Sequence, residues 1–385
     1  MCNNIYMKNV GILGGTFNPV HLEHVNMAIN AIKELQLDKL LIVPSKIPPH
    51  KNTIPLPGEE RLKMLELAFS NVEKVEICDW EIKQGGKSYS YLTVEHFSNV
   101  YKNANLYFIV GGDMLNDFRT WKNPSRILEL CDLAVFTREG YYTNYKQEKE
   151  YFIKNFNKSF IKLNYVGKNV SSTKIRVFSA FGLNLDGQSI KEVTEYIQKN
   201  NLYAQNNIVE FVKNNLTAKR LIHTANVTVL ALTKARELKL DENKILTACI
   251  LHDCAKYLNP KDFADFTLPI DVPSPVVHAF LGEHVARKVL KIEDEEVLDA
   301  IKYHTSGKAN MSDLAKLVFV ADMIEEGRDY EGVELLREEF EKDFENCFLL
   351  CLKEEMQHLI NKKSSIYIET INAYDYYINK KRDEE

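Results

Sequence analysis

The chain has 385 residues, which exceeds one ordinary core and suits two domains of about 180–200 residues each. Its apolar content of 45% and its charged content of 27% are those of a soluble globular protein. The formal net charge of −5 provides no broad basic surface, so we do not expect a nucleic-acid-binding protein.

The first residues lack a charged leader followed by a long apolar segment, and no stretch approaches about 18 uninterrupted apolar residues. We therefore expect no signal peptide, no membrane span and a cytoplasmic location. The seven cysteines are scattered, odd in number and never spaced as CxxC. This pattern disfavours a disulfide framework or a zinc knuckle and favours reduced, buried thiols.

Short apolar runs alternate with helical patterns in the first half of the chain. Residues 8–17 predict a strand that ends in a glycine turn, and an amphipathic helix follows it. Further strands are predicted at 39–45, 72–80, 105–113 and 132–138. Strands that alternate with helices predict an α/β, Rossmann-like domain with a parallel sheet and helices on both faces.

Ligands of such sheets bind beyond the carboxyl ends of the strands. The segments GGTF, PSKIPPHK, GGDM and TREG each follow a predicted strand. We therefore expect these four segments to border one shared site.

A polar, turn-rich stretch follows SSTKIR, and we place the domain boundary between residues 204 and 205. Beyond it nearly every segment has the pattern of an amphipathic helix. One long helix is predicted at 333–360, with charges on one face and apolar side chains on the other. The sequence thus predicts a first domain at 1–204 and an all-α second domain at 205–385.

The segment GGTFNPVHLEH has the chemistry of a polyphosphate site. Gly14 and Gly15 follow a strand, so backbone N–H groups can approach a polyphosphate without a Cβ in the way. Thr16 adds a hydroxyl donor. His21 and His24 lie three apart at a helix start, where both imidazoles can donate to triphosphate oxygens beside the positive helix end. The glycine pair alone is weak evidence, and the combination with HxxH is much stronger.

The motifs of the first half resemble those of bacterial nicotinate-nucleotide adenylyltransferases, in the HxGH nucleotidylyltransferase superfamily. They are GGTFNPVHLEH, PSKIPPHK, SYSYLT, GGDMLNDFRTWKNPSRIL, TREG and SSTKIR. The resemblance implies transfer of AMP from Mg²⁺-bound ATP to nicotinate mononucleotide, with release of pyrophosphate. This chemistry needs no protein nucleophile, because it depends on aligning two anionic reactants and stabilising the leaving pyrophosphate.

The resemblance also implies roles for single residues. His21 and His24 are the catalytic histidines that bind the ATP phosphates. The other implied ATP and phosphate contacts are Gly14, Gly15, Thr16, Phe17, Lys46, Asp113, Arg138, Ser171, Ser172, Thr173 and Arg176. The implied contacts of the nicotinate nucleotide and its reacting phosphate are His50, Lys51, Ser88, Tyr89, Thr93 and Trp121. Trp121 is expected to stack on the pyridine ring, and its alternative is an ordinary core position.

Two positions depart from the family pattern. Glu23 replaces the usual small residue of HxGH, where a side chain can crowd the phosphate loop. Leu92 stands where related sequences carry an acid, which leaves the orientation of the nicotinate nucleotide open. Neither position is a main phosphate ligand, so we expect activity to survive. The alternative for this domain is an adenylyltransferase for another acceptor, such as nicotinamide mononucleotide or pantetheine phosphate.

The second half holds six of the ten histidines, and the pair His252-Asp253 ends an apolar helical pattern. Adjacent helical positions rarely face the same way, so both residues can bind metal only near the helix end or if Asp253 bridges two ions. A mixed imidazole and carboxylate set suits harder divalent cations better than copper or a thiolate site.

The motifs RLIHT, LHDCAK, HAFLGEH, IKYHTSG and ADMIEEGRDYEGVELLRE resemble those of HD-superfamily hydrolases that cleave diadenosine tetraphosphate symmetrically to two ADP. The HD pair alone is a weak motif, and the set is specific. The resemblance implies two divalent ions, iron as first choice and manganese as second. Their implied ligands are His223, His252, Asp253, His278, His304 and Asp322. Asp253 would bridge the ions, and Asp253 and Lys256 would be the catalytic pair. Lys256 and Arg328 would neutralise the oligophosphate.

The sequence therefore predicts a bifunctional enzyme whose partners are the small molecules ATP, nicotinate mononucleotide and diadenosine tetraphosphate. Two alternatives remain for the HD domain. It can be a nucleotide-binding sensor with little turnover, or it can hydrolyse another nucleotide, such as a nucleotide monophosphate or guanosine tetraphosphate. Association into a homo-oligomer is left open by the sequence.

Overall fold

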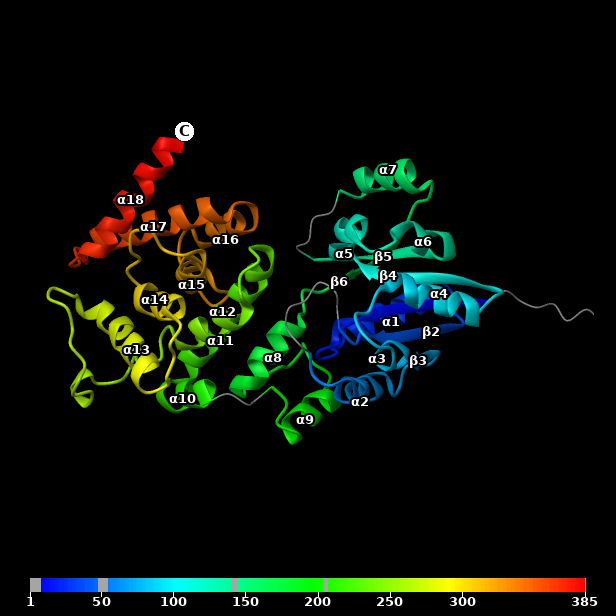
Figure 1. The fold of residues 1–385 in the computed structure, drawn as a ribbon, viewed down its shortest axis with the longest axis horizontal. Helices are drawn as coiled ribbons and strands as arrows, with labels where there is room; N and C mark the ends of the chain where they lie inside the picture. Colours follow the sequence, from blue (N-terminus) through cyan, green and yellow to red (C-terminus); the bar gives the residue numbers. More distant parts are fainter. Residues whose placement is uncertain (1–7, 48–54, 140–143, 204–206, 385) are drawn as a thin grey trace, which may run out of the picture. The chain divides into compact units, whose positions relative to one another are not determined.

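The computed structural model describes residues 8–47, 55–139, 144–203 and 207–384 (Figure 1). Grouped by their contacts, the residues form two compact units, Met1–Arg176 with Asn184–Asn200 and Val177–Leu183 with Asn201–Glu385. The first unit contains a parallel sheet with helices, and the described part of the second is helical. The predicted fold classes, α/β followed by all-α, are confirmed.

The strands are β1 (Lys8–Gly15), β2 (Lys39–Pro44), β3 (Val75–Ile77), β4 (Ala104–Gly111), β5 (Asp132–Arg138) and β6 (Ile161–Gly167). The helices up to residue 200 are α1 (Leu22–Glu34), α2 (Gly58–Phe69), α3 (Trp80–Lys83), α4 (Ser90–Val100), α5 (Gly112–Asp117), η1 (Phe118–Thr120), α6 (Pro124–Leu130), α7 (Tyr145–Phe156), α8 (Ser172–Phe181) and α9 (Lys191–Lys199).

The sheet has the order β3-β2-β1-β4-β5-β6, and all of its strand pairings are parallel. The direction of winding reverses between β1 and β4, which makes a crevice at their carboxyl ends the expected ligand position. Gly15 ends β1 and Gly111 ends β4, so the glycine motifs of the sequence border this position. The sequence did not predict β6, an edge strand whose residues are mostly exposed.

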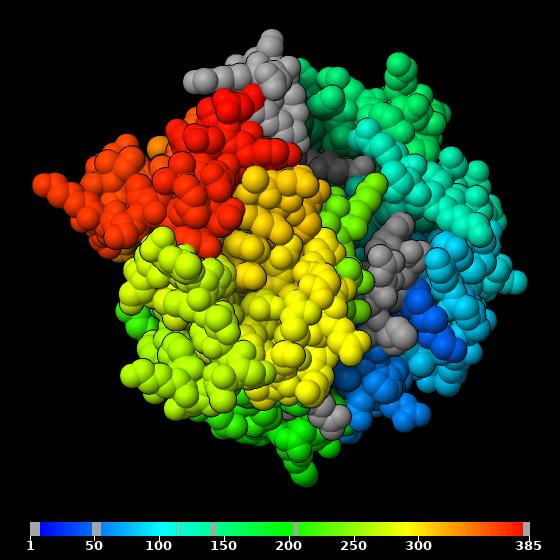
Figure 2. Space-filling model, turned by 60° about the vertical axis from the view of Figure 1, so that its left-hand side comes forward, coloured from blue at the N-terminus to red at the C-terminus, as the bar shows by residue number. Residues whose placement is uncertain are grey.

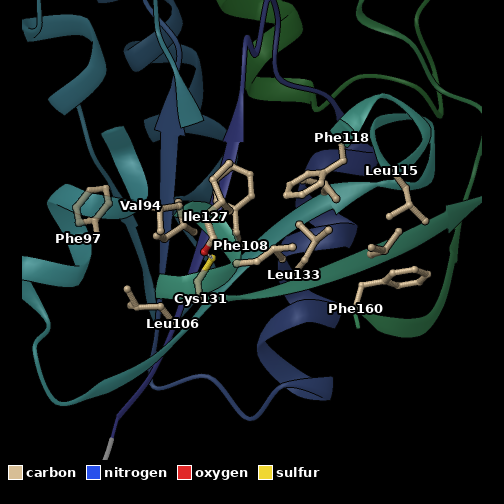
Figure 3. Close-up of a cluster of buried hydrophobic side chains, with 14 of the residues drawn as sticks. Val94, Phe97, Leu106, Phe108, Leu115, Phe118, Ile127, Cys131, Leu133 and Phe160 are labelled. Atoms are coloured by element: carbon tan, nitrogen blue, oxygen red, sulfur yellow. Dashed lines mark hydrogen bonds between the residues drawn. The ribbon is translucent and has the colours of Figure 1, made fainter. Parts of the chain in front are cut away.

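One face of the sheet packs against α4, α5, α6 and α7 (Figure 1). Figure 3 shows the core of this face, where Phe108 and Leu133 of the strands meet Val94 of α4 and Ile127 of α6. On the other face of the sheet, β1 packs closely against neighbouring side chains. A Cβ at Gly11 would lie 2.6 Å from the Leu37 side chain, so a larger residue there would have to displace that side chain.

Arg61 of α2 holds two strand-end loops together. Its side chain is buried, and Nη1 donates to the carbonyl oxygens of Thr16 at 2.9 Å and Ser45 at 2.6 Å. Nε donates to the carbonyl oxygen of Leu56 at 2.9 Å. Because Thr16 follows β1 and Ser45 follows β2, one guanidinium fixes the glycine loop and the PSK loop relative to each other. Sequence reasoning missed this residue.

The helices after residue 206 are α10 (Asn207–Asn215), α11 (Ala218–Glu237), α12 (Glu242–Leu251), η2 (Pro260–Asp262), η3 (Ser274–Val276), α13 (Val277–Lys288), α14 (Glu295–Tyr303), α15 (Asp313–Ile324), α16 (Val333–Lys342), α17 (Phe344–Asn361) and α18 (Ile368–Glu384). Side-chain caps set several of their starts, because the cap oxygen accepts an otherwise unpaired backbone N–H. These caps are Thr217, Asp241, Asp294, Ser312 and Asp343.

The prediction of one helix at 333–360 is wrong. Asp343 leaves the helical conformation and caps α17 by accepting the N–H of Asn346 at 3.0 Å, so α16 and α17 are separate helices. The last helix, α18, appears red beside the yellow segment in the space-filling view (Figure 2), and the N–H of Met311 donates to the hydroxyl of Tyr377 at 2.6 Å.

None of the described helices combines the length and apolar character that a membrane crossing requires. The cysteines at positions 78, 131, 249, 254, 347 and 351 are free thiols, and all but the first are buried.

Candidate active sites

The two histidines of the glycine-loop motif lie together at the start of α1. His21 is buried and stacks on His24, with ring centroids 3.6 Å apart and planes 26° apart. The backbone N–H of His21 donates to Nδ1 of His24 at 3.2 Å. A neutral imidazole that accepts at Nδ1 carries its proton on Nε2. His24 therefore offers an Nε2–H donor, as binding a phosphate oxygen requires.

Burial, assisted by the positive charge of Arg138, lowers the pKa of His21 to about 3. His21 is therefore neutral at neutral pH. The Coulombic effect also places Arg138, at the end of β5, within electrostatic range of the paired histidines.

The start of α8 lies against the segment that precedes the histidines. Ser172 Oγ donates to the carbonyl oxygen of Pro19 at 2.9 Å, and Nη1 of Arg176 donates to that of Asn18 at 2.8 Å. Nη2 of Arg176 also donates to Thr173 Oγ1 at 3.2 Å. Residues more than 150 positions apart thus form one cradle, in which the N-terminus of α8 can bind phosphate oxygens.

A cavity of about 290 Å³ lies beside the PSK loop and includes three of the predicted nicotinate-nucleotide contacts, Ser88, Tyr89 and Thr93. Ser88 Oγ accepts the N–H of Lys46 at 2.9 Å, which joins the cavity to that loop. Leu92 also lines the cavity.

The cavity has an aromatic pair that sequence reasoning did not predict. The ring of His96 stacks on Trp80 with centroids 4.5 Å apart and planes 15° apart. On the floor, Thr93 donates a short hydrogen bond to Glu81. Burial raises the pKa of Glu81.

Trp121 lies elsewhere. Its ring packs against Phe118 and Phe108, with centroids 5.2 and 6.0 Å away, at the edge of the hydrophobic core rather than in the lining of this cavity. His50 and Lys51 lie outside the described residues, and so does the side chain of Asp113.

The second site centres on Asp253. Its Oδ1 lies 3.0 Å from Nε2 of His278 and 3.6 Å from Nε2 of His304. Its Oδ2 lies 3.6 Å from Nε2 of His252 and 3.9 Å from Nε2 of His223. Each oxygen thus faces one histidine pair, and two possible three-residue metal sites share this carboxylate. Because α12 ends at Leu251, His252 and Asp253 are not restrained to different faces of a helix.

The remaining predicted ligand, Asp322, lies 3.0 Å from Nε2 of His223 through Oδ1. It also accepts a short hydrogen bond from Arg328, whose Nε donates to the Asp322 carbonyl oxygen at 2.7 Å. The structure therefore brings all six sequence-predicted ligands into one cluster, supplied by α11, α13, α15 and the ends of α12 and α14.

The histidine orientations fit metal binding. Nδ1 of His252 donates to the carbonyl oxygen of Cys249 at 2.6 Å, and Nδ1 of His304 donates to that of Ile301 at 2.8 Å. Nδ1 of His223 lies 3.0 Å from Glu325 Oε1. Each ring is fixed through Nδ1 and presents Nε2 to the cluster, which is the arrangement found behind metal-ligating histidines.

The charge states of Asp253, His252 and His278 also suit metal binding. Burial alone would raise the pKa of Asp253, but the neighbouring His252, His278 and His304 hold it well below its ordinary value. Burial lowers the pKa of His252 to about 3 and also lowers that of His278. The pKa of His223 is raised instead, because burial lowers it but hydrogen bonds with Asp322 and Glu325 outweigh that effect. An ionised carboxylate and neutral imidazoles are the forms that bind a divalent cation.

Cationic side chains border the cluster. Nζ of Lys256 lies 3.4 Å from Asp253 Oδ1, and Arg220, which sequence reasoning missed, lies 2.6 Å from Asp253 Oδ2. The motif RLIHT contained the signal, because Arg220 stands three residues before His223 on the same helical face. With Arg328, these groups give the site positive charge suited to a polyphosphate.

A cavity of about 420 Å³ adjoins the cluster. Its lining includes His304, Asp322 and Arg328 together with Glu354, Glu355 and His358. The side chain of His358 is exposed at this cavity.

Comparison with known proteins gives a family match for each half of the chain. A family model described as cytidylyltransferase-like matches residues 12–178, and an HD-domain model matches residues 220–327. A protein of Clostridium acetobutylicum named "Probable nicotinate-nucleotide adenylyltransferase" is 40% identical over 199 residues, which is 51% of this chain and all of that protein.

The chain belongs to the nicotinate-nucleotide adenylyltransferase family.

The resemblance extends beyond the adenylyltransferase half. A Mycoplasma genitalium protein named "Probable nicotinate-nucleotide adenylyltransferase/Ap4A hydrolase" is 29% identical over 343 residues, covering 85% of this chain and 91% of that protein. A Clostridium acetobutylicum structure described as a predicted HD superfamily hydrolase involved in NAD metabolism is 31% identical and covers 45% of this chain and 96% of that one, with a TM-score of 0.41. The HD-domain match at residues 220–327 implies divalent metal binding by the second half of the chain.

Acid should destabilise the adenylyltransferase unit through His21. The unfolded chain takes up a proton near pH 6.5, whereas folded His21 stays neutral down to about pH 3. The unfolded state therefore binds more protons in this window, and the free energy of unfolding falls by up to about 1.4 kcal/mol per pH unit as the pH decreases. Urea unfolding at pH 7 and 5 can be followed by fluorescence, because both tryptophans lie in this unit. His21→Gln should show a shallower pH dependence, and equal slopes would contradict the expectation.

Replacing Glu325 by Gln should weaken metal binding by the HD domain about 10- to 100-fold. Its carboxylate holds Nδ1 of His223 and is itself held by Asn226 Nδ2 at 2.8 Å. A glutamine keeps the shape but removes the charge that fixes the ring. Competition of bound Mn²⁺ with graded chelators measures the change. Glu345→Gln is the control, because Glu345 pairs with Lys316 instead; an affinity loss of equal size in the control would point to general destabilisation.

Proposed function

We propose that the chain is a bifunctional enzyme with its two activities in residues 1–204 and 205–385. The first transfers AMP from ATP to nicotinate mononucleotide, and the second hydrolyses diadenosine tetraphosphate to two ADP. The proposal rests on one observation. The same chain contains the stacked pair His21 and His24, which suits phosphate binding, and the cluster of possible metal ligands around Asp253. A relative aligned over 85% of the chain carries a name that combines both activities.

In the first reaction, an oxygen of the nicotinate mononucleotide phosphate attacks the α-phosphorus of ATP, and the bond to the β-phosphate oxygen breaks to release pyrophosphate. The protein contributes position and charge rather than a covalent intermediate. His24 donates from Nε2, Arg138 adds positive charge, and the start of α8 supplies backbone N–H groups. The cavity with Ser88, Tyr89 and Thr93 supports binding of the acceptor nucleotide.

A pyrophosphate-release assay with ATP and separate acceptors tests this reaction. Nicotinate mononucleotide should be preferred over nicotinamide mononucleotide and pantetheine phosphate. Turnover with another acceptor alone would assign a different adenylyltransferase activity, and no turnover with any of the three would reject the proposal for this half.

In the second reaction, His223, His252 and Asp322 would hold one ion, and His278 and His304 the other, with Asp253 between them. We propose iron as the physiological metal and manganese as the second choice. Bound ions of this kind supply positive charge to phosphate oxygens and lower the pKa of water. Arg220, Lys256 and Arg328 would neutralise the remaining phosphate charge.

The adjoining cavity favours a nucleotide over inorganic polyphosphate. At about 420 Å³ its volume lies within the roughly 300–1,000 Å³ of small-molecule sites. The carboxylates of Glu354 and Glu355 would repel a phosphate but accept hydrogen bonds from ribose hydroxyls or a base amino group. A nucleoside therefore fits beyond Arg328, with its phosphates directed to the cluster.

Product analysis after incubation with diadenosine tetraphosphate and Mn²⁺ or Fe²⁺ tests this assignment. Two ADP support symmetrical hydrolysis, whereas ATP plus AMP would reject the symmetry. Binding without any product would favour the nucleotide sensor. Guanosine tetraphosphate and nucleotide monophosphates, tested in parallel, decide whether another substrate is preferred.

A further inference from the structure

Glu23, which departs from the small residue usual in the family motif, does not point at the phosphate loop. Its side chain is 1% exposed, although it lies between the two phosphate-binding histidines in sequence. Oε1 accepts from Asn26 Nδ2 at 2.7 Å, and Oε2 accepts from the hydroxyl of Tyr165 at 2.9 Å and the backbone N–H of Lys168 at 2.9 Å. The expectation that the Glu23 side chain crowds the phosphate loop is therefore wrong. Its carboxylate points toward β6 instead.

These contacts join two segments that both lead to phosphate ligands. Tyr165 lies in β6, and Lys168 begins the short connection from β6 to Ser171 and α8. The packing at the strand end is close, since a Cβ at Gly167 would lie 3.1 Å from Oε2 of Glu23. A charged acceptor bound to a backbone N–H makes one of the stronger hydrogen bonds in proteins. Glu23 thus fixes where the connection to α8 begins.

Two further hydrogen bonds join the start of α8 to the segment before α1, and both have neutral acceptors. Ser172 and Arg176 donate to the carbonyl oxygens of Pro19 and Asn18, which precede His21. Glu23 adds a side-chain acceptor from within α1, the helix that carries His24, at a position between the two histidines in sequence. Its position in the first turn of α1 also suits the positive end of the helix dipole.

We propose that Glu23 is a positioning residue for adenylyl transfer, which sets the phosphate-binding start of α8 relative to His21 and His24. This inference rests on the proposed adenylyltransferase activity. Binding of the ATP triphosphate requires donors from both helices at once, so a shift of one helix start by about 1 Å would lower catalysis about 10- to 100-fold.

A matched control exists on the same helix. Glu34, the last residue of α1, also accepts backbone N–H groups of β6, from Asn164 at 2.7 Å and from Tyr165 at 3.0 Å. Glu23→Ala and Glu34→Ala therefore remove comparable contacts between α1 and β6. They differ in which end of the helix they release, and only the Glu23 end carries the histidines.

The test measures pyrophosphate release and Tm for Glu23→Ala, Glu23→Gln and Glu34→Ala, at a temperature where all three are folded. Glu23→Ala should raise the KM for ATP and lower kcat/KM about 10- to 100-fold. Glu23→Gln should stay within about threefold, because its amide oxygen still accepts from Lys168. Glu34→Ala should lower Tm by a smaller amount, because Glu34 is less buried, and should leave kcat/KM for ATP unchanged. Equal kcat/KM in the two alanine variants, or a glutamine variant as impaired as Glu23→Ala, would overturn the proposal.

Two further measurements keep the outcome interpretable. If Glu23→Ala does not fold, Glu23→Asp replaces it, since the shorter side chain keeps the charge but cannot span the distance to Lys168. An Asp variant with wild-type kcat/KM would then overturn the proposal. If the wild-type protein fails to adenylylate nicotinate mononucleotide, the proposed function fails separately, and calorimetric binding of a non-hydrolysable ATP analogue by the same variants still tests Glu23.

Discussion

Replacing Asp253 by Asn should remove metal from the HD domain and lower hydrolysis of diadenosine tetraphosphate by on the order of 10³-fold or more. Each oxygen of Asp253 faces a different histidine pair, so one substitution affects both possible metal sites. Loss of an outer partner alone weakens a metal site about 10- to 100-fold, and here both ions would lose a direct ligand. The amide offers one neutral oxygen in place of two charged ones.

The same substitution should leave adenylyl transfer at the wild-type rate. Metal content after dialysis against Mn²⁺, release of ADP and release of pyrophosphate are measured on one preparation of the full chain. Asp265→Asn is a suitable control, because Asp265 is an exposed acid of the same unit that contacts His284 at 3.2 Å and no predicted ligand. Wild-type metal content in the Asp253 variant would reject the Asp253-centred site.

The parallel sheet was predictable because its inner strands are buried on both faces and read as short apolar runs. The strand β6 was not, because it is an edge strand in which Lys162 and Asn164 interrupt the apolar residues and most side chains are exposed. The prediction of a single helix at 333–360 was also wrong. The apolar spacing continues across Asp343, and only the backbone geometry there reveals a cap.

Residues that bind ligands directly were easier to predict than those that hold them in place. Histidines and aspartates at characteristic spacings are rare, so His223 and Asp322 stand out in the sequence. Arg61 and Glu325 do not, because a charged residue in an amphipathic pattern normally predicts a solvated face, and Glu23 stood out only as a departure whose contacts could not be predicted. Their burial depends on strand ends, a neighbouring strand and a histidine ring that only the folded chain brings near.

Replacing His24 by Ala should lower kcat/KM for adenylyl transfer by about 10²- to 10³-fold, the range measured when one donor to a developing negative charge is lost. The N–H of His21 occupies Nδ1 of His24, which directs the proton of a neutral ring to Nε2. The His24 ring stacks on the buried His21 ring, which holds the Nε2–H donor in place. The orientation of this donor therefore needs little adjustment when ATP binds.

Replacing His24 by Gln distinguishes the effect of losing the Nε2–H donor from the effect of losing the imidazole ring. Its terminal amide nitrogen reaches roughly as far as Nε2 and also donates, so His24→Gln should recover part of the activity lost in His24→Ala. Asparagine is too short to place a donor there and should behave like alanine. Pyrophosphate release at saturating nicotinate mononucleotide, with ATP varied, compares the three variants. If all three lost activity equally, the stacked ring rather than the Nε2 donor would be the important feature, whereas wild-type activity in His24→Ala would remove the histidine pair from the site.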